Sequence, residues 1–263
     1  MDKRYEAYAS TVFNLILRDL LVFKQDFWGK FIDTCIMLCT TVVIFSYFLP
    51  SYGLRPDFGP FLLIGVIAGF GFFDVVGKVA TMTADLAGDK LILYSISLPI
   101  PAWLVFTYVG LSWALHSAII CLLLFPLGKL LLFSQFDLTI ISYPKLLLMF
   151  IMTNIFFGFF ALWLASVCKK MSSLSHLFVR VINPMYMFGG YLYSWHAVYA
   201  LSALGAYLSL ANPLIYTMEG MRAAILGQEG YLPFWFSFFA LMLFTIAFAW
   251  NAISRLKKRL DCI

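Results

Sequence analysis

Long apolar blocks separated by short polar stretches dominate the chain. Six of them approach the length of about 20 residues that a helix needs to cross the hydrocarbon core of a bilayer. These blocks are residues 31–48, 58–76, 101–124, 146–167, 174–193 and 233–253. The pattern predicts an all-α polytopic membrane protein, with residues 1–263 forming a single transmembrane domain.

A different pattern precedes the first block. In residues 7–28, apolar positions recur at steps of three and four, whereas polar residues such as Asn14, Arg18 and Gln25 lie on the opposite side. The apolar positions are Phe13, Ile16, Leu20, Phe23 and Phe27. This period is typical of an amphipathic helix that lies in the membrane surface.

Residues 81–97 are too polar to continue the second block. Charged residues near a bilayer centre cost about 2.5 to 3.5 kcal/mol each, and this segment carries Asp85, Asp89 and Lys90. It is also longer than two spans need in order to turn. We therefore expect an amphipathic helix that docks to a soluble partner through Asp85, Leu86, Gly88, Asp89, Lys90 and Leu91.

The basic residues indicate how the chain crosses the membrane. Residues 194–232 are apolar but broken by Gly and Pro, which leaves open a seventh span or a re-entrant external hairpin. With six spans and both ends inside, all but four of the 18 Lys and Arg lie on the cytoplasmic side, the exceptions being Arg55, Lys129, Lys145 and Arg222. Because Lys and Arg favour the cytoplasmic side, we expect six spans with cytoplasmic N- and C-termini.

Composition and the absence of known motifs limit the ligands and reactions that we expect of this chain. The chain is 63% hydrophobic and 12% charged, against roughly 25% charged for a soluble domain. Residues 71–78 (GFFDVVGK) depart from a phosphate-binding loop in glycine spacing, and Val79 replaces its Ser or Thr. His116, His176 and His196 are scattered, and the five Cys lack the neighbours of a metal site. We expect no catalytic residue, cofactor, metal or nucleic-acid partner on this chain.

Three features lie within the predicted spans. Gly65 and Gly69, followed by Gly71, offer a smooth face for close helix packing. Asp74 lies four residues before Lys78, so it is either a functional intramembrane carboxylate or the partner of that lysine. In the fifth block, Asn183-Pro184 removes a backbone donor and predicts a kink.

Two segments carry a family resemblance. The run NPLIYTMEGMRAAILG, with Asn212, Pro213, Glu219 and Arg222, resembles the Asn-Pro segment before the last span of type-2 ABC exporter permeases. Ala87 to Lys90, continuing to Ser97-Leu98-Pro99, is similar to their coupling helix, although Asp and Lys replace the usual Arg and Glu. Independently of the family, Asn212 and Pro213 predict a helix start, and Glu219 and Arg222 are spaced to pair.

The resemblance implies a non-catalytic membrane subunit of an ATP-driven exporter in the cytoplasmic (inner) membrane. Two copies, as a homodimer, would bind two ATPase chains that hold ATP and Mg, and would move a drug, lipid or lipid-linked glycan. The pathway lining would include Tyr186, Tyr191, Tyr193, Trp195 and Tyr199, which an interfacial aromatic belt explains equally well. A secondary transporter or channel and a membrane-embedded enzyme are the alternatives.

Overall fold

The computed structural model describes residues 3–48, 52, 58–88, 91–133, 135–168 and 170–260. Over this part of the chain the protein is all helical, with no strand. Five helices are long and apolar enough to cross a membrane. They are α1 (Lys3–Val43, continued by the π-helical turn η1, Ile44–Phe48), α2 (Phe58–Ala87), α4 (Ala102–Leu132), α5 (Tyr143–Val167) and α11 (Phe234–Leu260).

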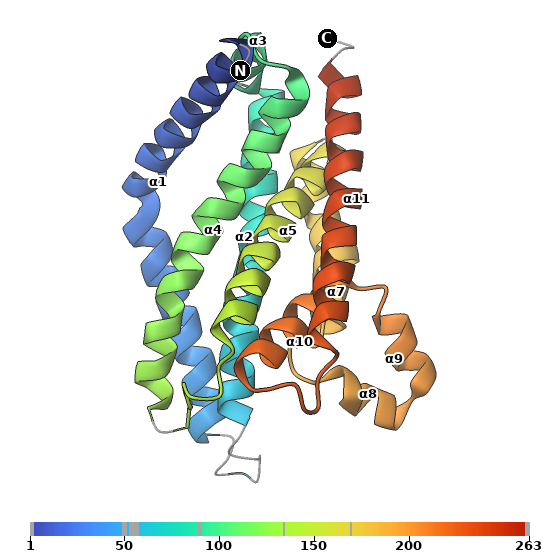
Figure 1. The fold of residues 1–263 in the computed structure, drawn as a ribbon. Coiled ribbons are helices and arrows are strands. Elements are labelled where there is room, and N and C mark those ends of the chain that lie inside the picture. Colours follow the sequence, from blue (N-terminus) through green and yellow to red (C-terminus); the bar gives the residue numbers. More distant parts are fainter. Residues whose placement is uncertain are drawn as a thin grey trace.

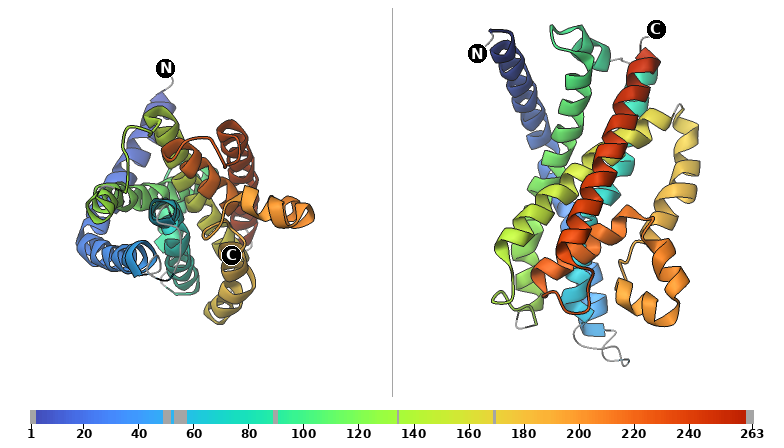
Figure 2. Two further views of the ribbon diagram at one scale, coloured as in Figure 1. Left: turned by 90° about the horizontal axis from the view of Figure 1, so that it is seen from below. Right: turned by 45° about the vertical axis from the view of Figure 1, so that its right-hand side comes forward.

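The long helices run up and down in one bundle (Figure 1). Both termini and the short helix α3 (Leu91–Ser97) lie at one end of it. Three further helices, α8 (Trp195–Leu201), α9 (Ala203–Ser209) and α10 (Pro213–Ile225), lie toward the other end. α8 and α9 project from the bundle, whereas α10 runs back into it (Figures 1 and 2).

The N-terminal region differs from the expectation of a surface helix at 7–28 followed by a span at 31–48. α1 runs without interruption through both ranges. Gly29 is the only helix-weakening residue between them, and one glycine costs only about 1 kcal/mol in a helix. At its N-terminal end the helix diverges from α11 (Figure 2), whereas its Leu15 still packs against the start of α4.

The second and third predicted spans also end later than expected. α2 continues past residue 76 to Ala87, so the first part of the predicted 81–97 helix is the end of α2. Only Leu91–Ser97 forms a separate helix. α4 continues past residue 124 and through Pro126 to Leu132. Long apolar helices tolerate such a proline because local adjustments satisfy the freed carbonyl.

The fifth block, 174–193, is not one long helix. It forms α6 (Leu174–Leu177), a π-helical turn η4 (Phe178–Ile182) and α7 (Asn183–Met187). Pro184 lies two residues after the end of the π-helical turn, as expected where an amide donor is missing. Together these elements reach about 21 Å at 1.5 Å per residue, short of a bilayer core of about 30 Å. The chain then turns irregularly from Phe188 to Ser194.

Helix α5 lies at the centre of the packing, in contact with α2, α4, α10 and α11. Its crossing with α4 is very close, because a Cβ on Gly158 would stand 2.2 Å from the carbonyl oxygen of Gly110. The predicted smooth face of α2 is confirmed. A Cβ on Gly65 would lie 3.2 Å from the Arg222 guanidinium, and one on Gly69 would lie 3.1 Å from Met218. These glycines let α10 approach α2.

Candidate functional site

The side chain of Arg222 on α10 is completely buried. Its Nη1 donates to the carbonyl of Gly190 at 2.6 Å, and its Nη2 donates to the carbonyl of Tyr191 at 2.7 Å. Longer bonds reach the carbonyls of Tyr193 (3.3 Å) and Phe61 (3.4 Å). The guanidinium carbon lies 3.4 Å from the centroid of the Phe61 ring. One cation therefore joins α10 to α2 and to the turn after α7.

Glu219, one helical turn earlier, is equally buried. Its Oε1 accepts from the backbone N–H of Trp195 at 3.2 Å, and its Oε2 accepts from that of Leu232 at 3.0 Å. The predicted pairing with Arg222 is confirmed, with Nη1 and Oε1 3.9 Å apart. That distance exceeds a hydrogen bond, so each charge binds backbone groups more closely than it binds the other charge.

The positions of those backbone groups explain why two charges are buried here. Residues 188–194 and 226–233 are irregular or turn segments, and the groups that Arg222 and Glu219 bind include those of the buried residues Gly190, Tyr191 and Leu232. Their N–H and C=O groups lack the partners that a helix provides, and unsatisfied groups away from water are costly. Arg222 satisfies carbonyls of the first segment, while Glu219 satisfies amides at the ends of both. The pair therefore holds the re-entrant part of the chain in place.

The start of α10 follows the sequence prediction. Asn212 caps the helix, its Oδ1 accepting from the backbone N–H of Leu214 at 3.1 Å, and Pro213 lies in the first turn. The Asn212 amide also donates to the carbonyl of Met185 at 2.7 Å. This second bond, which the sequence did not predict, ties α10 to α7.

At the other end of the bundle, Asp85 connects α2 to α3. Its Oδ2 accepts from the backbone N–H of Ile92 at 3.0 Å, which satisfies one of the open donors at the start of α3. Leu86 is half-buried against the core, and Gly88 is exposed. Asp89, Lys90 and the Leu91 side chain lie outside the described residues. The capped α3 buries Ile92 and Ser95 and exposes Tyr94 and Ser97.

The five aromatic residues predicted to line a pathway fall into separate groups. Tyr186 and Tyr191 pack together with ring centroids 4.9 Å apart, and Tyr186 also contacts Phe73 of α2. Trp195 stacks on Tyr199 at 5.2 Å in the projecting α8–α9 arm. The Tyr193 hydroxyl donates to the carbonyl of Met187. The structure does not bring all five to one surface.

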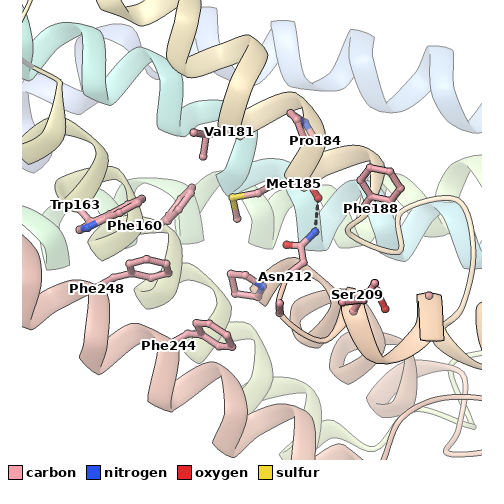
Figure 3. Close-up of a pocket in the computed structure, with 14 residues that line it drawn as sticks. Phe160, Trp163, Val181, Pro184, Met185, Phe188, Ser209, Asn212, Phe244 and Phe248 are labelled. Atoms are coloured by element: carbon pink, nitrogen blue, oxygen red, sulfur yellow. Dashed lines mark hydrogen bonds between the residues drawn. The ribbon is translucent and has the colours of Figure 1, made fainter. Parts of the chain in front are cut away.

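An apolar pocket of about 570 Å³ lies instead between α5, α7, α9 and α11. Figure 3 shows aromatic rings on one side and the η4–α7 segment on the other. None of the five predicted lining residues contributes to it. Its aromatic and apolar wall includes Phe160, Trp163, Val181, Met185, Phe244 and Phe248. Its size is typical of small-molecule sites, which range from about 300 to 1,000 Å³.

A second buried ion pair lies in the bundle. Lys78 is 2.9 Å from Asp74, as in the second of the two alternatives for Asp74, and its ammonium also donates to the carbonyl of Trp113 (2.9 Å) and the hydroxyl of Ser117 (2.5 Å). These contacts occupy all three donors of a lysine ammonium. The pair links α2 to α4 in a way that the sequence pattern did not reveal.

No group of three or more His, Cys, Asp or Glu that could hold a metal ion occurs among the described residues. Cys35, Cys39, Cys121 and Cys168 are free thiols. Neither a known protein-family model nor a curated protein sequence matches this chain. The long apolar helices define the protein as a multi-span helical membrane protein.

Proposed function

We propose that this chain is the membrane subunit of an ATP-driven exporter of amphiphilic molecules. Two copies would form the pathway, and two separate ATPase chains would bind at the end that carries α3 and both termini. That end would face the cytoplasm. The observation that carries the proposal is the position of α3, a short helix between two long membrane helices at the same end as both termini (Figure 1).

The geometry of α3 supports a role in transmitting force. It begins three residues after the turn at Gly88, and the Asp85 carboxylate caps its first turn. One face packs on α2 and α4, whereas Tyr94 and Ser97 face outward. A partner that pressed on the outward face would therefore displace two membrane helices together.

The other end supports a path for an amphiphile. The pocket between α5, α7, α9 and α11 is almost wholly apolar and aromatic, which suits an acyl chain or a flat ring system. Beside it, α10 is held by Asn212, Glu219 and Arg222 rather than by apolar packing alone. We assign the pocket to the apolar part of the substrate.

The two alternative classes find less support. A membrane-embedded enzyme needs a polar catalytic cluster with free groups, and the buried charges of the described residues are occupied by backbone or ion-pair partners. A secondary transporter needs an ionisable group that exchanges its ligand. Lys78, with all its donors used, offers none.

The test is purification of the full-length chain from its native membrane in mild detergent. The proposal expects an ATP-binding-cassette protein to copurify in equal amount, encoded by a reading frame beside this one. A chain that purifies alone and transports its substrate under an ion gradient would refute the proposal and favour a secondary transporter.

A further inference from the structure

Helix α4 carries polar groups toward two different neighbours. Toward α2 it presents the Trp113 carbonyl and the Ser117 hydroxyl, which accept from the Lys78 ammonium. The Ser117 hydroxyl also donates to Asp74 at 3.3 Å, which closes a ring of contacts between the two helices. With Lys78 only 6% exposed, this ring lies away from solvent.

Toward α1 the same helix presents Tyr108 and Ser112, about one turn nearer the α3 end. Both hydroxyls donate to the Asp19 carboxylate, Ser112 at 3.0 Å. Further along, the His116 ring stacks on Phe23 of α1 with centroids 4.5 Å apart. Asp19 is therefore bound to α4, a contact that the pattern of residues 7–28 did not predict.

We propose that these two polar contacts are clamps that make α1, α2 and α4 move as one body when α3 is pushed. Asp19 with Tyr108 and Ser112 forms the first clamp. Asp74 and Lys78 with Trp113 and Ser117 form the second. Separating a charged side chain from its hydrogen-bond partners carries a penalty that grows with burial. It is largest for Lys78, which is 6% exposed, and smaller for Asp19, which is 25% exposed and also pairs with Arg18. The clamps thus transmit displacement between helices that apolar packing alone would let slip.

The clamps also give the N-terminal half of α1 a role. That half diverges from α11 (Figure 2), and its contact with α4 includes a small apolar cluster around Leu15, Ile100, Val105 and Tyr108. Asp19 fastens it to the helix that follows α3. A partner that pressed on α3 would move the N-terminal half of α1 through α4 and through the apolar cluster, against which Ile96 of α3 also packs.

Spin labels on the purified full-length chain test the clamps directly. One pair of labels at Ala84 and Thr107 reports on α2 and α4, and a second pair at Ser10 and Thr107 reports on α1 and α4; Ser10 and Ala84 are exposed, and Thr107 is half-buried. The native cysteines are replaced beforehand. The width of each distance distribution, measured by pulsed electron resonance in lipid nanodiscs, is the readout.

The expected result is a crossed pattern. The charge-neutral double variant Asp74→Asn, Lys78→Met broadens the first distribution and leaves the second unchanged, while Asp19→Ala does the reverse. Thr245→Val is the matched control, because it removes a buried hydroxyl that bonds only within its own helix. It should leave both distributions unchanged.

Unchanged distributions in the clamp variants, or equal broadening of both distances, would overturn the proposal. If the double variant does not fold, Ser117→Ala removes a single acceptor and must still broaden the first distribution alone. The inference rests on the proposed function only in treating α3 as the point that is pushed. The distances need no ATPase, so a crossed pattern supports the clamps whatever the copurification experiment finds, and a chain that purifies without an ATPase would refute the exporter alone.

Discussion

The buried pair Glu219 and Arg222 allows a prediction with a magnitude. Replacing Arg222 with Ala orphans the carbonyls of Gly190 and Tyr191, each of which accepts a short bond. Hydrogen bonds to charged groups contribute about 1.5–3 kcal/mol each, so these two bonds account for about 3–6 kcal/mol. The variant also leaves the Glu219 carboxylate buried without its counter-charge, which raises the cost further.

A double-mutant cycle separates the contribution of the hydrogen bonds to backbone groups from that of the attraction between the two charges. At 3.9 Å, the attraction between the two charges is at most about 4 kcal/mol for an effective dielectric constant near 20. Glu219→Ala combined with Arg222→Ala recovers only this coupling, because the backbone groups at residues 190, 191, 195 and 232 stay unsatisfied. We therefore expect the double variant to be less destabilised than the sum of the single variants, yet still at least about 3 kcal/mol less stable than the parent chain.

The assay is reversible unfolding in mixed detergent micelles, followed by tryptophan fluorescence and circular dichroism. Arg255→Ala is the control, because Arg255 makes an exposed bond to Asn251 within its own helix and should change stability by less than about 0.5 kcal/mol. A double variant as stable as the parent would refute the backbone-anchoring role. If either single variant changed the free energy of unfolding by no more than the control does, the stabilising role of the Glu219–Arg222 pair would be refuted.

Three further predictions concern packing, capping and topology. In the same unfolding assay, Gly158→Ala should destabilise the chain strongly, because its Cβ would stand 2.2 Å from the Gly110 carbonyl. Gly77→Ala is the control: its Cβ would meet nothing within 4 Å, so this variant should be neutral or stabilising. Asp85→Ala should increase amide hydrogen exchange in α3 by removing its cap; unchanged exchange would contradict the capping role. A membrane-impermeant thiol reagent should not label Cys262 in intact cells, and labelling would place the C-terminus outside.

Much of the architecture follows from local sequence rules. Stretches of about 20 apolar residues predict α2, α4, α5 and α11, and the capped start of α10 at Asn212 and Pro213 follows from elementary helix chemistry. Glycine spacing on α2 predicts a close neighbour, and spacing along a helix predicts the two ion pairs. These features depend on residues that lie near one another in the sequence.

The structure differs from the sequence-based expectations where parts of the chain that are distant in the sequence come into contact. The apolar period of residues 7–28 predicted a separate helix in the membrane surface, but the structure has one continuous helix α1, whose Asp19 accepts from hydroxyls of α4. Likewise, nothing local indicates that Arg222 binds carbonyls some 30 residues earlier, or that a pocket forms between α5 and α11. Such contacts depend on the tertiary arrangement, which period and composition do not encode.

The central claim, that an ATPase drives this chain through the segment around α3, is tested most directly by ATP hydrolysis. The chain is reconstituted in lipid vesicles with its copurified ATPase, and substrate-stimulated hydrolysis is measured for the parent and for Asp89→Lys, with Asp137→Lys at the opposite end of the bundle as control. The account predicts that Asp89→Lys abolishes stimulation while membrane insertion and dimer formation persist, and that the control keeps it. Normal stimulated hydrolysis in Asp89→Lys would contradict the account.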